Sequence, residues 1–219
     1  MKQANKSLRC SILTIILFIG YTILIKVVDI KFVTTTSTVI GLGTLNLWFH
    51  QLTTVNMFLY HLGDWLSIIP LLICLGFAMT GGYQLITRKS IFKVDNHLLK
   101  LGCYYALLLC IYLLFEVIPI NYRPLLIDGV LEVSYPSSTT LLVLCVMRTF
   151  AYHIRFYLKD EQTKKIIIRF TMLFSIFMII IRTLSKVHWI TDIIGWILLS
   201  NALYYFYKYL ILNIQNRRN

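Results

Sequence analysis

Six stretches of mostly apolar residues recur along the chain, and each approaches the length that a helix needs to cross a lipid bilayer. A spanning helix takes about 20 apolar residues, because each residue adds about 1.5 Å to a hydrocarbon core about 30 Å thick. The stretches lie at residues 8–28, 65–86, 98–118, 137–154, 166–181 and 191–212. They predict an all-α fold, a polytopic bundle of six transmembrane helices that forms a single domain over residues 1–219.

The overall composition excludes a soluble globular protein. Apolar residues make up 58% of the chain and charged residues 14%, whereas soluble domains have roughly 45–50% and 25%. No segment alternates polar and apolar residues over a useful length, so strands are not predicted. The first stretch is too long for the apolar part of a signal peptide, and no small-residue cleavage site follows it, so it is expected to be retained.

Three segments connect the stretches on one side of the membrane, at residues 29–64, 119–136 and 182–190. The first contains many Thr and aromatic residues, and we expect a short interfacial helix near residues 45–60. Most of the 21 Lys and Arg residues fall on the opposite side. Because basic residues collect in cytoplasmic loops, both termini are predicted to be cytoplasmic. The net charge of +12 therefore indicates orientation and contact with lipid headgroups, and nucleic-acid binding is not indicated.

Polar and ionisable residues gather at the outer ends of the later helices, at residues 121–124, 135–140 and 182–192. In the last group, His188 and Asp192 are four positions apart, which would place them one turn apart on one face of a helix. Asp192 would then hold one imidazole nitrogen and leave the other as a nucleophile. Arg182, just before this helix, offers a planar fork for phosphate oxygens.

The middle group has the features of a helix start that binds anions. Pro136 suits the first turn of a helix. Ser137, Ser138 and Thr139 bring hydroxyl groups to backbone N–H groups that have no partner within the helix. Arg123 adds a second guanidinium from the preceding loop. Ordinary capping and contact with lipid headgroups would explain each residue by itself, but the grouping of all three clusters favours a phosphate site.

The order of these residues resembles the type 2 phosphatidic acid phosphatase (PAP2) family. That family carries K-x6-R-P, then P-S-G-H, then S-R-x5-H-x3-D on one side of a six-helix bundle. This chain has Arg123-Pro124, then Pro136-Ser137, then Arg182-x5-His188-x3-Asp192. The resemblance covers about residues 116–196; the earlier helices match in number and topology.

The resemblance implies a lipid phosphate phosphatase in a cell membrane, such as a bacterial cytoplasmic membrane, with its active face outside. His188 would attack phosphorus and form a phosphohistidine, and Asp192 would orient it. Arg123 and Arg182 would hold the phosphate, with Ser137, Ser138 and Thr139 as further donors. No metal and no cofactor is implied, and the bilayer and a membrane lipid phosphate are the implied partners.

Four positions depart from the family pattern. Glu116 replaces the first-motif Lys and Ile181 the Ser before Arg182, while Ser138 replaces the Gly and Thr139 the general-acid His of the second motif. A Thr hydroxyl does not supply a proton near neutral pH. A phosphomonoester leaving from a lipid diphosphate needs that proton less than an alkoxide does, so we expect preference for a diphosphate, such as a polyprenyl diphosphate, over phosphatidic acid.

Other readings remain open at this level. One alternative is a catalytically inactive member of the family that binds lipid phosphate or a partner without turnover. Thr139 in place of the general-acid His and Glu116 in place of the Lys favour this alternative. Glu116 would pair with an arginine, and His50 or His61 would replace the missing acid. A transporter is disfavoured because the six stretches have almost no charges at their centres. The five cysteines lack metal-ligand spacing and are expected to pack as small apolar side chains.

Overall fold

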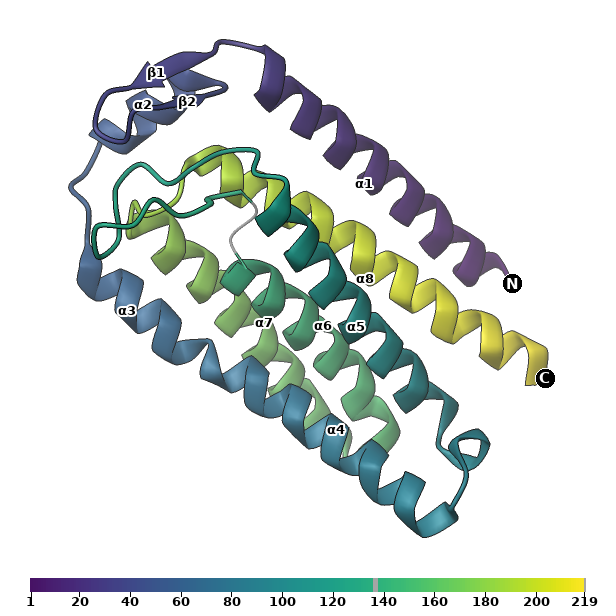
Figure 1. The fold of residues 1–219 in the computed structure, drawn as a ribbon. Helices are drawn as coiled ribbons and strands as arrows, with labels where there is room; N and C mark the ends of the chain where they lie inside the picture. Colours follow the sequence, from purple (N-terminus) through teal and green to yellow (C-terminus); the bar gives the residue numbers. More distant parts are fainter. Residues whose placement is uncertain (136–137, 219) are drawn as a thin grey trace.

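The computed structural model describes residues 1–135 and 138–218, and long helices dominate it (Figure 1). The helices are α1 Lys2–Val27, α2 Gly43–Gln51, α3 Met57–Leu66, α4 Ile68–Arg88, α5 Asn96–Val117, α6 Ser138–Tyr157, α7 Glu161–Leu184 and α8 Ile190–Arg218, with one 3-10 turn at Ile91–Lys93. Two short strands, β1 Lys31–Val33 and β2 Thr38–Ile40, complete the fold. The predicted helical class therefore holds for the body of the molecule.

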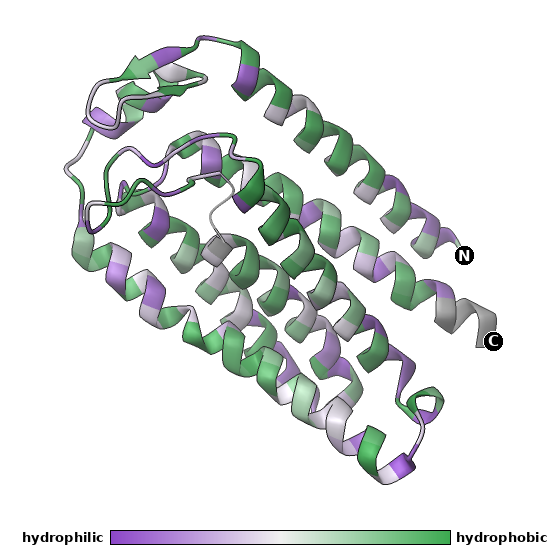
Figure 2. Ribbon diagram, viewed as in Figure 1, coloured by the Kyte–Doolittle hydropathy of each residue, from purple (hydrophilic) through white to green (hydrophobic). Residues whose placement is uncertain are grey.

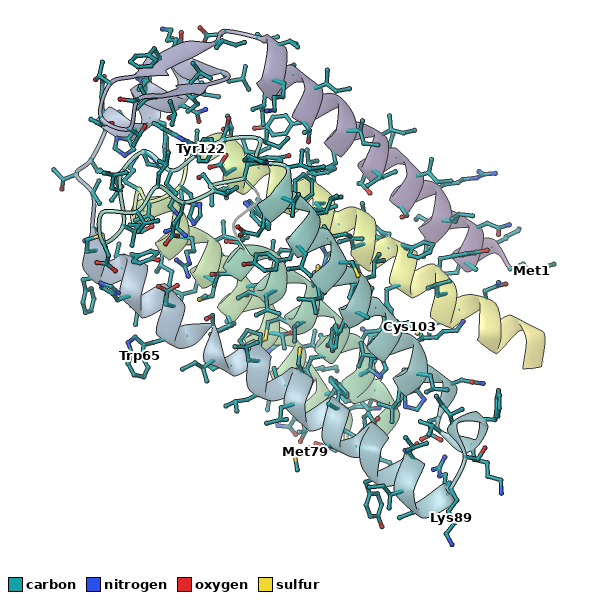
Figure 3. The ribbon with its side chains drawn as sticks, viewed as in Figure 1. Met1, Trp65, Met79, Lys89, Cys103 and Tyr122 are labelled. Atoms are coloured by element: carbon teal, nitrogen blue, oxygen red, sulfur yellow. The ribbon has the colours of Figure 1, made fainter. Side chains whose placement is uncertain are left out.

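The long helices lie side by side along one common direction (Figure 1). Helix α1 packs along α8, and α6 packs against both α7 and α8. Both chain termini lie at one end of this bundle, together with the turn between α4 and α5, and the loops that follow α5 and α7 lie at the other end. Tyr122 marks the loop end in Figure 3, while Met1 and Lys89 mark the opposite end.

Four helical segments are long and apolar enough to cross a membrane, namely Lys2–Val27, Met57–Arg88, Asn96–Val117 and Glu161–Leu184. Hydrophobic residues dominate these helices (Figure 2), and large apolar side chains such as Trp65 and Met79 are 73% and 67% exposed. This is the surface expected of a protein that lipid surrounds. The chain is a membrane protein by this criterion.

Helices α6 and α8 run alongside these four but fall outside that set of four. Both contain polar side chains that the bundle interior satisfies: Arg148 on α6 donates to Asn201 on α8 at 2.7 Å and stacks on Tyr204. Much of α6 is buried, including Val143, Cys145 and Met147. Packing against protein relaxes the need for apolar side chains that contact with lipid imposes. Four of the six predicted spans meet the criterion of length and apolar character among the described residues, and the count of six stays a prediction.

The segment between α1 and α4 differs from the prediction. The expectation of no strands was wrong here, because β1 and β2 form an antiparallel hairpin in which Lys31 pairs with Ile40 and Val33 with Thr38. The hairpin is too short to give an alternating signal, but its buried side chains, Val33 and Ile40, pack against Trp189 just before α8. The single interfacial helix expected at 45–60 is two helices, α2 and α3.

The start of α8 is held by close packing against the loop that precedes α6. Tyr135 is fully buried, stacks on Phe18 of α1, and shares a hydrogen bond with Thr22 at 2.8 Å. A Cβ atom at Gly195 would lie 2.4 Å from the Tyr135 ring, so only glycine allows this approach. Tyr135 thereby joins α1, α8 and the loop, and fixes where the polar residues of that loop lie.

Candidate active site

The candidate site lies at the loop end of the bundle, where four separate segments meet. They are helix α3, the loop after α5, the C-terminal turn of α7 and the loop that leads into α8. A backbone hydrogen bond from Asn56, the N-cap of α3, to the carbonyl of Ser185 joins two of them at 3.1 Å. Another from Ser134 to Asn121, at 2.9 Å, closes the loop after α5 on itself.

His188 lies in the short connection between α7 and α8, where Lys186 has a φ of 59° and turns the chain. The imidazole is 3% exposed. Its Nδ1 lies 3.2 Å from the backbone carbonyl oxygen of Ser134. Because a carbonyl oxygen only accepts, Nδ1 must carry the hydrogen, and in the neutral ring the lone pair is then on Nε2. The site thus selects the tautomer that a nucleophilic histidine requires.

The expected one-turn geometry between His188 and Asp192 was wrong, because α8 begins at Ile190 and His188 precedes it. Asp192 is the third residue of α8 and accepts from the backbone N–H of Trp189 at 3.0 Å, as in a capping box. It also accepts from Asn121 at 3.2 Å and from the Ser134 hydroxyl. The Ser134 hydroxyl lies 3.2 Å from Nδ1 of His188, so Ser134 stands between the two.

Arg182 lies in the last turn of α7, not in the connection after it, and its side chain is 1% exposed. One of its terminal nitrogens donates to Asp64 on α3 and to the Thr139 hydroxyl, the latter at 2.9 Å. The Nε–H is buried and has no partner among the described residues. A Cβ atom at Gly63 would lie 3.0 Å from Nε, so α3 approaches Arg182 through a glycine.

Arg123 enters the site from the loop after α5. Its backbone N–H bonds to the carbonyl of Glu132 at 3.0 Å, and the two side chains form an ion pair at 2.8 Å across this narrow loop. A terminal nitrogen also donates to the Tyr60 hydroxyl at 3.2 Å. Its buried Nε–H, like that of Arg182, has no partner among the residues that the structure describes.

Tyr60 brings the two arginines together. The guanidinium carbons of Arg123 and Arg182 lie 5.5 and 5.3 Å from the centre of its ring. Such stacking is favourable for a guanidinium. The Arg182 side chain is buried and that of Arg123 is 13% exposed, and each keeps an Nε–H without a partner among the described residues. Two such cationic forks beside one aromatic ring have the donors that a compact anion with several oxygens, such as phosphate, would need.

The electrostatics of the site keep His188 neutral. Burial lowers its pKa well below the usual 6.5, and the positive charges of Arg123 and Arg182 lower it further, against the weaker effect of the Ser134 carbonyl. An imidazole in this position is unprotonated at neutral pH. The same arginines that would bind an anion therefore also keep the neighbouring nitrogen available as a nucleophile.

The remaining expected residues divide into several groups. The Thr139 hydroxyl accepts a hydrogen bond from Arg182 and so lies in the site. Pro136 and Ser137 lie outside the described residues, as does the side chain of Ser138. The ion pairs expected of Glu116 are formed instead by Asp64 and Glu132, and Glu116 is exposed near the end of α5. Among the described residues, no group of three His, Cys, Asp or Glu side chains is placed to hold a metal ion.

The histidines considered as substitute acids lie in other surroundings. Nε2 of His50 contacts the carbonyl of Lys186 at 3.2 Å, and its ring packs on Trp189. His61 is exposed on α3, beside the ring of Tyr60. Neither contact is with the arginines or with Thr139.

Sequence reasoning missed three residues that complete the site: Tyr60, Asp64 and Ser134. Tyr60, Gly63 and Asp64 have the spacing i, i+3 and i+4 of one helix face, and this spacing is the one signal that predicts their grouping. Ser134 carries no such signal, because it acts in an irregular loop. Its partner His188 is 54 positions away in the sequence.

Comparison with known proteins supports the fold. No family model matches the sequence, and no curated protein matches it. The structure is similar to that described as "Crystal structure of the first transmembrane PAP2 type phosphatidylglycerolphosphate phosphatase from Bacillus subtilis". The TM-score is 0.62, the sequence identity is 16%, and the match covers 94% of this chain and 97% of that chain. The chain thus has the fold of a PAP2-type membrane phosphatase along nearly its whole length.

Proposed function

We propose that this protein is a membrane phosphatase of the PAP2 type that removes phosphate from a lipid phosphate or diphosphate at the outer face of the membrane. The observation that carries this proposal is the meeting of two guanidinium groups at Tyr60, close enough to His188 for their charges to lower its pKa, while the lone pair of that histidine is on Nε2. A phosphoryl group held by both forks would be presented to that nitrogen. The similarity in fold to a PAP2-type phosphatase agrees with this chemistry.

In the first step, Nε2 of His188 attacks phosphorus. A nitrogen–phosphorus bond forms, the bond between phosphorus and the lipid oxygen breaks, and its electron pair leaves on that oxygen. Arg123 and Arg182 stabilise the charge on the non-bridging oxygens. The imidazole becomes positive, and the hydrogen bonds from Nδ1 to Ser134 and from Ser134 to Asp192 stabilise it. In the second step, water attacks the phosphohistidine, inorganic phosphate leaves, and neutral His188 returns.

Before either step, phosphate must replace two carboxylates. Asp64 and Glu132 now occupy the terminal nitrogens of the arginines, and their side chains are 43% and 41% exposed, whereas those of Arg182 and Arg123 are 1% and 13% exposed. The arginines are fixed and the acids reach solvent, so the acids are the groups that swing away. A buried guanidinium needs an anionic partner, and a dianionic phosphate could take the place of each carboxylate with charge-assisted hydrogen bonds of its own.

The leaving group decides which substrate suits this site. Thr139 lies beside Arg182 where the family's general acid would stand, and it supplies no proton near neutral pH. A lipid monophosphate leaving from a diphosphate is a weak base and leaves without one. We therefore propose a lipid diphosphate, such as a polyprenyl diphosphate, as the preferred substrate over phosphatidic acid.

A second function has one observation in its favour. Each guanidinium already has a carboxylate partner within the chain, which lowers the positive field that phosphate meets. A protein that binds lipid phosphate or a partner without turnover would tolerate this arrangement together with Thr139.

The test is phosphate release by purified protein from undecaprenyl diphosphate and from phosphatidic acid, with His188→Ala as the control. Release that disappears in the control, with the diphosphate preferred, is the expected result. Equal turnover of both substrates would contradict the leaving-group argument. A folded protein that releases phosphate from neither would favour the second function, and binding of the same lipids would then decide its role.

A further inference from the structure

A groove leaves the candidate site and runs down the outside of the bundle between α4 and α5. Its upper part, a hollow of about 460 Å³, is lined by Ser67 just before α4 and Leu71 of α4, by Leu108 and Tyr112 of α5, and by Thr139 of α6. Thr139 is the residue whose hydroxyl receives the hydrogen bond from Arg182. The hollow therefore begins at a residue that contacts Arg182 of the candidate site.

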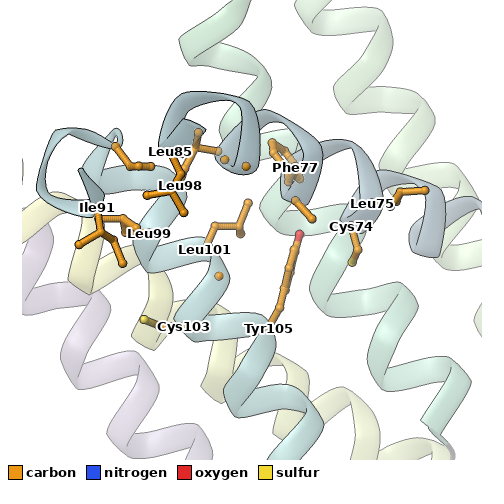
Figure 4. Close-up of a pocket in the computed structure, with 15 residues that line it drawn as sticks. Cys74, Leu75, Phe77, Leu85, Ile91, Leu98, Leu99, Leu101, Cys103 and Tyr105 are labelled. Atoms are coloured by element: carbon orange, nitrogen blue, oxygen red, sulfur yellow. The ribbon is translucent and has the colours of Figure 1, made fainter. Parts of the chain in front are cut away.

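A second hollow of about 660 Å³ continues toward the other end of the bundle (Figure 4). Its lining is almost wholly apolar and includes Phe77 and Leu85 of α4, Ile91 of the following turn, and Leu98 and Leu101 of α5. Cys74 and Tyr105 line both hollows, so the two meet there. In Figure 4 the ring of Tyr105 points from α5 toward α4 at this junction.

The groove exists because side chains are missing along it. Gly81 and Gly82 of α4 and Gly102 of α5 line the lower hollow. A Cβ atom built at any of the three would meet nothing within 4 Å. Glycine weakens a helix relative to alanine, and none of these positions has a positive φ that requires it. Neither helix stability nor backbone conformation explains why glycine occupies these three positions, and the open space is their consequence.

The length of the groove is close to the thickness of the hydrocarbon core of a bilayer. From Ser67 to Leu85 the lining follows α4 for most of its length, about 27 Å at roughly 1.5 Å per residue. The hydrocarbon core is about 30 Å thick. One acyl chain of a diacyl lipid crosses only the leaflet in which its headgroup lies, and would leave the lower hollow unfilled. A single polyprenyl chain is long enough to fill both.

We propose that this groove binds the hydrocarbon tail of the phosphate-bearing lipid, and that its lower half, lined by Gly81, Gly82 and Gly102, selects a single long chain of the polyprenyl class. The inference rests on the proposed function for the position of the headgroup. Its own content is the path of the tail and the dependence of recognition on tail length.

The experiment fills the lower hollow and varies the tail. Gly81→Leu and Gly102→Leu place a large side chain in the groove, and Gly76→Leu is the matched control, because Gly76 lies on the same helix in open space but does not line the groove. Phosphate release is measured with farnesyl and undecaprenyl diphosphates. We expect KM for the long substrate to rise about tenfold, the effect of roughly two lost methylene contacts, with the short substrate and the control unchanged.

Equal effects on both substrates, or an effect of Gly76→Leu as large as that of Gly81→Leu, would overturn the proposal. Binding of the two lipids to His188→Ala protein, measured by native mass spectrometry with and without Gly81→Leu, separates it from the question of catalysis. Loss of undecaprenyl diphosphate binding alone would support the tail site even if the wild type released no phosphate. Undiminished binding would overturn the proposal that the tail lies in the groove.

Discussion

Ser134 is the residue on which the candidate chemistry depends most closely after His188. Its carbonyl oxygen fixes the tautomer of His188, and its hydroxyl transmits the charge of Asp192 to the imidazole. Ser134→Ala removes the second contact and keeps the first. We expect kcat for phosphate release to fall about tenfold, since one hydrogen bond that stabilises a charged imidazole is lost.

The comparison with His188→Ala makes this test specific. Ser134→Ala should keep a measurable rate and an unchanged KM, whereas His188→Ala should have none. A rise in KM without a fall in kcat would show that Ser134 acts only in substrate binding. Ser134→Thr, which keeps the hydroxyl, should recover most of the rate.

The lowered pKa of His188 predicts how stability depends on pH. In the unfolded chain the imidazole takes up a proton below its ordinary pKa of about 6.5, and in the folded protein it does so only at lower pH. The unfolded state then binds more protons, so stability is fully present above pH 6.5 and falls as the pH drops below it.

The measurement is thermal unfolding in detergent at pH 7.5 and 5.0. The wild type should lose more stability on acidification than His188→Asn, a variant whose amide can still donate to the Ser134 carbonyl but cannot titrate. An identical loss in the two proteins would mean that other groups account for the acid sensitivity. The acidic limb of the pH–rate profile should likewise lie below pH 6.5.

At the scale of the elements, α3 closes the site with one face. Arg182 stacks on the ring of Tyr60, approaches α3 closely at Gly63, and forms an ion pair with Asp64. Asp64→Asn removes the charge that competes with phosphate while keeping the shape of the side chain. We expect inorganic phosphate to inhibit this variant a few-fold more strongly than the wild type, because the neutral amide no longer competes with phosphate for the buried Arg182 guanidinium.

Asp128→Asn serves as the control for Asp64→Asn, because it removes an exposed acid from the loop after α5 without touching an arginine. It should leave phosphate inhibition unchanged. Weaker inhibition of Asp64→Asn would show instead that the carboxylate positions Arg182 for the ligand.

The packing of α8 against Tyr135 gives a prediction of stability. Gly195→Ala would place a methyl group 2.4 Å from the Tyr135 ring, and the ring has no free space because it is fully buried. We expect a loss of about 1–3 kcal/mol, the usual result of overpacking. Gly20→Ala on α1, where a Cβ atom meets nothing within 4 Å, should be neutral or stabilising. Unfolding of both variants in detergent measures the difference.

At the scale of the whole molecule, the orientation in the membrane is a prediction from charge that labelling can test. Lys31 lies in β1 at the loop end, and Lys89 lies at the end where both termini meet (Figures 1 and 3). In a variant without the five natural cysteines, a membrane-impermeant maleimide should label Lys31→Cys in intact cells. It should label Lys89→Cys only after lysis. The reverse pattern would place the candidate site in the cytoplasm.

The body of the bundle was predictable because its physics is local. A helix in lipid satisfies its own backbone hydrogen bonds, so long apolar stretches must become helices wherever they lie in the sequence. The strands were missed because a three-residue strand has no period to detect. Helices α6 and α8 were also predicted as spans. Their polar residues, such as Arg148 and Asn201, form hydrogen bonds with each other inside the bundle, and hydropathy alone does not predict such a pair.

By itself, the sequence determined the helical membrane class and placed Arg123, Thr139, Arg182, His188 and Asp192 at helix ends on one side. Only the tertiary structure decided that Ser134 stands between His188 and Asp192, that Asp64 and Glu132 are the partners of the arginines, and that a groove leads away from Thr139. The reason is distance along the chain. Arg182 and Asp64 are 118 positions apart in the sequence. Their contact forms only when α3 and α7 pack together, so no local sequence pattern predicts it.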